Sequence, residues 1–236
     1  MYWPRITLER VNSTNSLALD LLKAGFTPPF VVIAYEQKEG KGRYGHRWFS
    51  PRGGVFLSLA IREGLKSWTL LAANAVIRAT EFLLEDHLPS HLEIKLPNDV
   101  LLKGKKIAGI LGEQSGDNTV IGIGWNVSIR EFPGEIKERA TSLTIETGRV
   151  FPVEVAQDLL ILQLKEIERE LRIAPGNLFK EWKKRIGDLG KRIRFEARGA
   201  TMEGVLADIT EDFKILLEGQ GEIVDLLEIK NLERLE

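Results

Sequence analysis

The stretch from Gln37 to Ser58 reads QKEGKGRYGHRWFSPRGGVFLS, and it is the most unusual part of the chain. Glycines lie among basic residues, and Trp48 and Phe49 interrupt them. Glycine lets backbone N–H groups approach a ligand closely, the basic side chains supply positive charge, and the tryptophan supplies a flat ring. The stretch therefore suits a ligand that combines a phosphate with a ring.

Composition narrows the class of protein. The chain has 236 residues, 43% hydrophobic and 28% charged, which is ordinary for a globular protein with a full core. Its 33 lysines and arginines nearly balance 34 aspartates and glutamates, so no overall basic footprint for nucleic acid is visible. The absence of cysteine excludes disulfides, thiolate nucleophiles and cysteine metal sites. No apolar run approaches the ~20 residues of a membrane span, and no signal core begins the chain, so we expect a cytoplasmic protein.

Outward from the loop, the apolar pattern predicts short strands and a few helices. Strands are expected at residues 6–11, 30–35 and 55–61, and in an antiparallel meander from 92 to 127. Helices are expected at residues 67–88, 153–173 and 177–186. A further early helix would be capped by Ser13 or Thr14 and would end at Gly25. Residues 128–149 are polar and are expected to form a connection or flap.

A domain boundary is predicted near residues 187–190, which read GDLG. Beyond it, short strands are expected at residues 192–195, 203–209, 214–217 and 223–226. We therefore predict a main domain over residues 1–187 and a small β-barrel domain over residues 188–236. The fold class is α+β, with a mixed, mostly antiparallel sheet flanked by helices.

The loop also matches a dinucleotide fingerprint, because Gly40, Gly42 and Gly45 have the spacing GxGxxG after a strand. A dinucleotide site requires the third glycine to begin a helix whose N-terminus holds the pyrophosphate. Residues 46–54 contain a proline and two glycines and then enter a strand, so that helix is not expected. We reject the dinucleotide interpretation.

Two clusters of residues further along the chain also suggest a ligand site. Residues 95–100 read KLPNDV and are followed by KKIAGIL at 105–111, while residues 122–127 read GIGWNV. Taken separately, Asn and Asp after proline are usual turn formers, and paired lysines are typical of a hairpin end. Glycines inside a strand weaken it unless something must approach the backbone closely.

In this order the three clusters resemble the catalytic domain of the biotin–protein ligases. That family has a G-x-G-R-x-G-x-x-W-x-S-P-x-G-G loop, then K-W-P-N-D, then a K-x-x-x-G-x-L strand and then G-x-G-x-N. Residues 13–15, which read STN, and the small C-terminal domain match as well, so the resemblance covers almost the whole chain. It implies a class II synthetase-like catalytic domain followed by an SH3-like barrel.

Three positions depart from the family pattern. Leu96 replaces a tryptophan, His46 stands where a second arginine is common, and Trp125 stands where isoleucine or leucine is usual. We expect Leu96 to change packing rather than chemistry and Trp125 to fill the core. His46 removes a fixed charge near the phosphates.

The resemblance implies an ATP-dependent ligase that activates biotin as biotinyl-5′-AMP and transfers it to a lysine of a biotin carboxyl carrier protein. The implied catalytic residues are Arg43, Lys106 and Asp99, and Asp99 is also the candidate ligand of Mg²⁺. The implied biotin-binding residues are Ser13, Thr14, Gln37, Lys41, Arg43, Lys106, Gly109, Gly122 and Gly124. The implied ATP-binding residues are Lys41, Arg43, Trp48, Asn98, Lys106 and Asn126.

Other interpretations stay open at this point. Trp48 could simply anchor the loop, and Asn126 could be a polar residue at a strand end. A lipoate–protein ligase shares the fold and the adenylate chemistry, and a non-catalytic regulator could bind biotinyl-adenylate without transferring it. The resemblance also implies a possible homodimer, and the catalytic motifs begin too early for a preceding DNA-binding domain.

Overall fold

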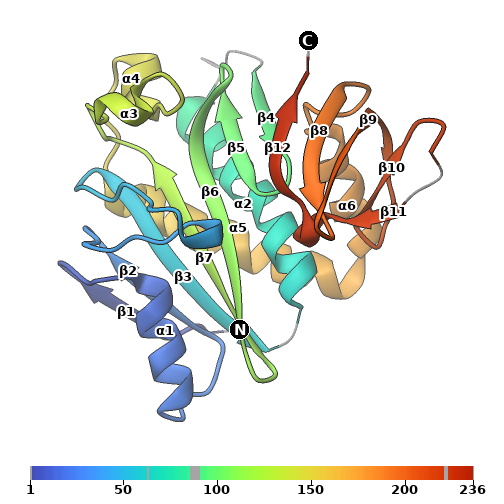
Figure 1. Ribbon diagram of the computed structural model, residues 1–236. Helices are drawn as coiled ribbons and strands as arrows, with labels where there is room; N and C mark the ends of the chain where they lie inside the picture. Colours follow the sequence, from blue (N-terminus) through green and yellow to red (C-terminus); the bar gives the residue numbers. More distant parts are fainter. Residues whose placement is uncertain (1, 63, 86–90, 221–222, 236) are drawn as a thin grey trace.

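A seven-stranded sheet forms the centre of the protein (Figure 1). The computed structural model describes residues 2–62, 64–85, 91–220 and 223–235. The strands are β1 (Arg5–Leu8), β2 (Phe30–Ala34), β3 (Gly54–Arg62), β4 (Leu92–Lys95), β5 (Asp99–Leu102), β6 (Lys105–Ser115) and β7 (Asn118–Asn126). They lie in the order β1-β2-β3-β7-β6-β5-β4. Strands β1 and β2 are parallel and the other neighbours are antiparallel, which confirms the predicted mixed sheet.

Helices cover the two faces of this sheet unequally. They are α1 (Thr14–Lys23), α2 (Leu65–Leu84), α3 (Gly134–Lys137), α4 (Leu143–Thr147), α5 (Val153–Ile173) and α6 (Pro175–Lys184). Helix α1 packs on one face, and α2 with α5 covers the other (Figure 1). None of the helices in the described ranges is both long and apolar enough to cross a membrane.

Alternation along β2 shows how the two faces are filled. Phe30 and Val32 pack with Ala18 and Leu22 of α1, while the intervening Val31 belongs to the large core under α2 and α5. Since successive side chains of a strand point to opposite faces, a strand buried on both sides is apolar throughout. This explains the continuous apolar run in the sequence before the glycine loop.

Helix α1 begins where the sequence predicts. Ser13 is its N-cap and accepts a hydrogen bond from the backbone N–H of Ser16 at 3.4 Å. Gly25 follows the helix with φ +91°, a conformation that favours glycine. Trp125, one of the departures from the family pattern, is fully buried in the large core, which confirms that it fills the core.

Several bounds differ from the sequence-based prediction. The strand expected at residues 6–11 runs only from Arg5 to Leu8. Helix α2 starts two residues early, and its predicted end at 86–88 lies outside the described residues. The stretch 128–149 contains α3 and α4, which are too short to show a helical period. The prediction also missed strand β12, because Leu232 is its only buried residue and no alternation marks it.

A second sheet occupies the C-terminal part of the chain (Figure 1). Its strands are β8 (Arg192–Ala197), β9 (Ala200–Ile209), β10 (Lys214–Leu217), β11 (Ile223–Asp225) and β12 (Lys230–Arg234), with a 3₁₀ turn η3 (Leu226–Glu228). They are antiparallel in the order β11-β10-β9-β8-β12. One hydrophobic cluster includes residues from both sheets. The domain division after residue 187 and the closure of this sheet into an SH3-like barrel stay predictions.

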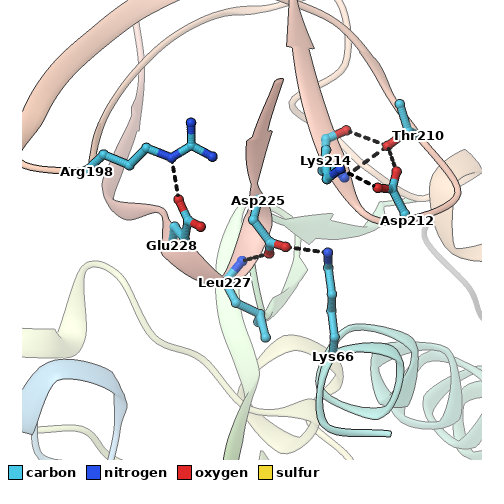
Figure 2. A network of polar contacts seen from close by, with 8 residues as sticks. All are labelled: Lys66, Arg198, Thr210, Asp212, Lys214, Asp225, Leu227 and Glu228. Carbon is cyan, nitrogen blue, oxygen red and sulfur yellow. Dashed lines mark hydrogen bonds and ion pairs between the residues drawn. The ribbon is translucent and has the colours of Figure 1, made fainter. Parts of the chain in front are cut away.

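Polar contacts also join the second sheet to the rest of the chain. Asp188 is fully buried and accepts hydrogen bonds from the backbone N–H of Leu96 at 2.8 Å and from Nε of Arg234 at 2.5 Å. On another side, Lys66 at the start of α2 pairs with Asp225, which also caps η3 by accepting from the N–H of Leu227 at 2.9 Å (Figure 2). These contacts fix the position of η3.

We expect Asp188→Ala to lower the free energy of unfolding by about 3 kcal/mol, because it leaves the buried N–H of Leu96 unpaired and removes one carboxylate from Arg234. Urea unfolding followed by tryptophan fluorescence measures the change. Asp212→Ala is the matched control, since Asp212 pairs with Lys214 at the surface (Figure 2) and its loss should leave the midpoint almost unchanged. Equal midpoints for the two variants would contradict the role of Asp188.

Candidate active site

The glycine loop lies on the α1 side of the sheet, over strands β6 and β7. It contains a short 3₁₀ turn at Arg43–Gly45, in which Tyr44 has φ 55°. After this turn the chain contains no helix before β3, and residues 52–53 form a turn in which Gly53 has φ +102°. The loop therefore supplies no helix N-terminus for a pyrophosphate, as the sequence predicts.

A cavity of ≈ 290 Å³ lies between the loop and the sheet. Every residue predicted for the site lines it except Asn126. Ser13, Thr14 and Gln37, which we call its polar end, line it together with Lys106 and Asp99. The structure therefore brings together residues that the sequence spreads over more than a hundred positions.

A second, larger cavity of ≈ 730 Å³ adjoins the first. Asn126 lines it, together with Phe132 and the segment 138–140. Trp48, Asp99 and Lys106 line both cavities and so form the wall between them. Arg47 and Lys95 also line both, so the two cavities meet at one acidic and three basic side chains.

The wall is organised around Lys106. Its Nζ lies 2.6 Å from Oδ1 of Asp99 and 5.0 Å from the centre of the Trp48 ring. The backbone of Lys106 is fixed as well, because its N–H donates to Arg139 O at 2.8 Å and its carbonyl accepts from Thr141 N at 3.0 Å. The ammonium group is therefore held at the junction of the two cavities.

The indole of Trp48 lies against two glycines of the sheet, Gly109 and Gly124. A Cβ atom on Gly124 would come within 2.3 Å of the indole, and one on Gly109 within 3.0 Å. Any side chain at Gly124 would displace the ring. Nε1 of Trp48 is buried and has no hydrogen-bond partner among the described residues. Trp48 thus both anchors the loop and presents an unpaired donor between the cavities.

Gly122 lies next to the side chain of Asn15. A Cβ atom there would lie 2.2 Å from Oδ1 of Asn15. Asn15 is buried, and its Nδ2 donates to Oε2 of Glu113 at 2.7 Å while its Oδ1 lies 2.5 Å from Oγ of Ser58. Neither Ser58 nor Glu113 is among the residues that the sequence predicts for the site. A lone serine within an apolar strand and a glutamate on the same strand face as Gly109 are the signals that could have found them.

Gln37 continues this polar arrangement on the other side of Thr14. Its Oε1 accepts from the backbone N–H of Thr14 at 2.8 Å and lies 3.1 Å from the threonine hydroxyl. Its Nε2 donates to Ser50 Oγ at 3.0 Å, and Ser50 in turn donates to the carbonyl of Trp48 at 3.0 Å. The polar end of the first cavity is therefore connected to the loop.

Arg43 links the loop to the second sheet. Its Nη2 donates to the carbonyls of Leu227 at 3.1 Å and Ile229 at 2.8 Å, and the Tyr44 hydroxyl donates to the same Ile229 carbonyl at 3.0 Å. Burial lowers the pKa of the Arg43 guanidinium, with Tyr44 and Asp99 acting in the opposite direction. Arginine nevertheless stays protonated near neutral pH.

The remaining predicted residues take more peripheral places. Lys41 is exposed on the loop and lines the first cavity, as does the exposed His46. Asn98 donates from Nδ2 to the carbonyl of Ile110 and lines the first cavity rather than the second.

Asn126 is almost completely buried beside the second cavity. Its Nδ2 donates to Thr141 O at 3.0 Å and to Lys106 O at 3.4 Å. Its Oδ1 has no partner among the described residues, although buried polar atoms are normally paired. An acceptor is thus available to a ligand in the second cavity.

Comparisons with known proteins agree with this geometry. The profile of the "Biotin/lipoate A/B protein ligase family" matches residues 7–128, which is more than half of the chain. The chain belongs to this family. A biotin–acetyl-CoA-carboxylase ligase from Mycobacterium tuberculosis is 31% identical, over 92% of this chain and 85% of the relative. The corresponding ligase from Paracoccus denitrificans is 32% identical, over 90% of this chain and 93% of the relative.

Solved structures of the family show the same fold. The biotin protein ligase from Aquifex aeolicus, in complex with biotin and ATP, superposes with a TM-score of 0.87 at 26% identity. The superposition covers 99% of this chain and 100% of the other. Family membership and the fold class predicted from the sequence are therefore confirmed.

We expect Gly122→Ala to lower the free energy of unfolding by about 2 kcal/mol, because the added methyl group must displace the Asn15 side chain from Glu113 and Ser58. Thermal unfolding followed by circular dichroism measures the effect. Gly176→Ala is the control, since a Cβ at Gly176 meets nothing within 4 Å. A Gly122→Ala protein as stable as Gly176→Ala would contradict the close approach of Asn15.

Proposed function

We propose that the chain is a biotin–protein ligase. It joins biotin and ATP to give biotinyl-5′-AMP and pyrophosphate, and it then transfers the biotinyl group to a lysine of a biotin carboxyl carrier protein. The observation that carries the proposal is the meeting of two cavities at Lys106 and Asp99. An acyl-adenylate is a molecule of two such halves, with its reactive bond at the junction.

Biotin would occupy the first cavity with its ureido ring against Ser13, Thr14 and Gln37. The ureido group offers two N–H donors and one carbonyl acceptor, and hydroxyl and amide groups can pair with both kinds of atom. The dithiolane ring of lipoate has no such groups and would leave these side chains without partners, which costs free energy in a buried site. The polar end of the cavity thus favours biotin over lipoate, and calorimetry with both acids tests the preference.

The nucleotide would extend into the second cavity. The unpaired Oδ1 of Asn126 can accept from the amino group of adenine, and Trp48 provides a flat surface beside it. The phosphates would then lie near Lys106, Arg43 and Lys41. Asn98 would act near the junction, because it lines the first cavity.

The first step brings a carboxylate to a phosphate, so the site must stabilise negative charge. A carboxylate oxygen of biotin attacks the α-phosphorus, and the bond from that phosphorus to the bridging oxygen of pyrophosphate breaks. Lys106 and Arg43 supply the positive charge at this junction. In the second step the neutral amine of the acceptor lysine attacks the acyl carbon, AMP leaves, and the amine loses a proton. Asp99 would orient that lysine.

ATP is expected to bind together with a magnesium ion. The described residues contain no cluster of three or more acidic or histidine side chains. Mg²⁺ is usually held by one or two carboxylates together with substrate phosphates. A single carboxylate from Asp99 would therefore be enough as the protein ligand. When bound, the ion would neutralise phosphate charge.

Two wider properties belong to the same proposal. We place the reaction in the cytoplasm, where ATP is available. A homodimer is also proposed, because β1 lies at the edge of the seven-stranded sheet and could pair with a second copy. Analytical ultracentrifugation tests the dimer.

Incubation with biotin, MgATP and a biotin carrier domain should add one biotinyl group to the lysine of the carrier, measured as a mass gain. Lys106→Ala should reduce adenylate formation by about a hundredfold or more while the fold is kept, because a charged donor at the reacting centre is lost. Lys105→Ala is the matched control, since the neighbouring lysine lines neither cavity. No gain on any carrier would refute the function, and full activity of Lys106→Ala would refute its role.

Arg43→Ala should increase the release of biotinyl-adenylate into solution by roughly tenfold to a hundredfold, because it removes charged hydrogen bonds that hold the loop to the second sheet. Rapid filtration of radiolabelled adenylate measures the release. Arg198→Ala serves as the control, since Arg198 pairs with Glu228 on the same turn η3 without touching the loop (Figure 2). Retention equal to that of the unaltered protein would contradict the closing role of Arg43.

A further inference from the structure

Lys95 is the strand residue at the wall between the two cavities that the proposed reaction leaves unused. The residues that line both cavities are Arg47, Trp48, Lys95, Asp99 and Lys106. Asp99 is the only acid among them, and it is paired with Lys106. Lys95 is half-buried, and its side chain has no hydrogen bond or ion pair to any other residue in the described part of the chain. The wall therefore carries a positive charge on β4 that no neighbouring acid balances.

The register of the sheet fixes the face to which Lys95 points. The successive cross-strand pairs are Lys95 with Asp99, Asp99 with Gly109, and Gly109 with Gly124. Residues directly opposite each other on neighbouring strands have their side chains on the same face. The four positions thus form one row across the sheet, and the indole of Trp48 covers the two glycines at one end of it. Lys95 lies at the other end, about 10 Å from Gly109 by two strand spacings.

This row gives the proposed first step a direction. The polar end of the first cavity lies over β3 and β7, since Thr14 contacts Ser58 of β3 at 2.8 Å and Asn15 fills the space above Gly122 of β7. Biotin bound there would bring its carboxylate to Lys106 from the side of β7. Attacking and leaving oxygens lie roughly in line on opposite sides of the phosphorus. Pyrophosphate would therefore leave toward β4.

We infer that Lys95 is a catalytic residue that binds the leaving pyrophosphate during adenylate formation. The inference rests on the proposed function. When the bond between the α-phosphorus and the bridging oxygen breaks, its electron pair stays on that oxygen, and the pyrophosphate gains negative charge. The ammonium group of Lys95 stabilises this charge without any transfer of a proton. Lysine suits the task, because it is a compact point charge with three donors.

The place of Lys95 on a strand distinguishes it from the cations of the loop. Arg47 also lines both cavities, but it is exposed on the loop, and its Nη2 donates to the carbonyl of Lys38 at 2.7 Å. Strand β4 is held on both sides, because it pairs with β5 and the N–H of Ile94 donates to the carbonyl of Arg185 at 2.6 Å. The charge of Lys95 therefore does not depend on the position of the loop.

The two half-reactions separate the role of Lys95 from that of Lys106. Pyrophosphate takes part only in the formation of the adenylate, since transfer to the carrier releases AMP. Loss of the charge on Lys95 should therefore slow the first half-reaction alone. Lys106 lies at the junction where both reactions occur, so its loss should slow both of them.

Lys95→Met tests the inference, because methionine keeps an apolar stem and removes the charge. Release of pyrophosphate from biotin and MgATP should be roughly tenfold to a hundredfold slower, the effect of one lost hydrogen bond to a charged group. Transfer from preformed biotinyl-5′-AMP to a biotin carrier domain should change by less than about twofold. In the reverse reaction, the KM for pyrophosphate should rise by about tenfold. Lys95→Arg keeps the positive charge and should recover most of the rate.

Lys105→Met is the matched control, since Lys105 lines neither cavity and should leave both half-reactions unchanged. Calorimetric binding of biotin should be the same for Lys95→Met, Lys105→Met and the unaltered protein, which shows that the first cavity is intact. Lys95→Gln is a second neutral variant and keeps the test valid where Lys95→Met does not fold.

Release of pyrophosphate by the folded neutral variants at the rate of the unaltered protein would overturn the inference. An equal loss in both half-reactions would overturn it as well, because the charge would then act on the reacting bond rather than on the leaving group. In both cases the proposed function would stand. Absence of adenylate formation by the unaltered protein would instead remove the proposed function, and this inference with it.

Discussion

The site depends on the absence of two side chains from strand β7. Gly122 and Gly124 point to the same face of the sheet, and each leaves room that a larger residue would fill. Asn15 of α1 enters one space and Trp48 of the loop enters the other. Two segments that are distant from β7 in the sequence are thereby held against it. The two cavities and the wall between them follow from this contact.

The second constraint is the attachment of the loop to the C-terminal sheet. A loop rich in glycine loses much conformational entropy when it becomes ordered, so it needs specific contacts to hold one shape. Arg43 and Tyr44 provide them through the carbonyls of Leu227 and Ile229. Those carbonyls are in turn positioned because Asp225 caps η3 and pairs with Lys66 of α2 (Figure 2). The C-terminal part of the chain therefore helps to shape a cavity that is lined mainly by the glycine loop and the seven-stranded sheet.

The sequence predicted the longer helices and most of the strands, and its predicted site residues line the first cavity except Asn126, because both leave local signals. The apolar run before the loop and the serine that caps α1 can be recognised within a few residues. The contacts of Asn15 with Glu113 and Ser58 could not be predicted in this way. Asn15 and Glu113 are 98 positions apart, and their contact depends on how α1 crosses β6 and β7. A hydrogen-bond direction also depends on every partner in the chain at once, so no single residue reveals it.

The pairing of Lys106 with Asp99 limits the positive charge available for the proposed first step, in which biotin and ATP would form biotinyl-5′-AMP. While the two side chains lie 2.6 Å apart, the charge of the lysine is largely balanced by the aspartate. A carboxylate and a phosphate that approach this wall together therefore meet little net positive charge unless another group contributes. Arg43 can contribute, since the bonds to the second sheet use Nη2 and leave Nε and Nη1 as donors within the described structure. Under the proposed function the guanidinium of the loop would add its charge to that of Lys95 on β4, which also lines both cavities, so the positive charge at this wall would depend on the position of the loop.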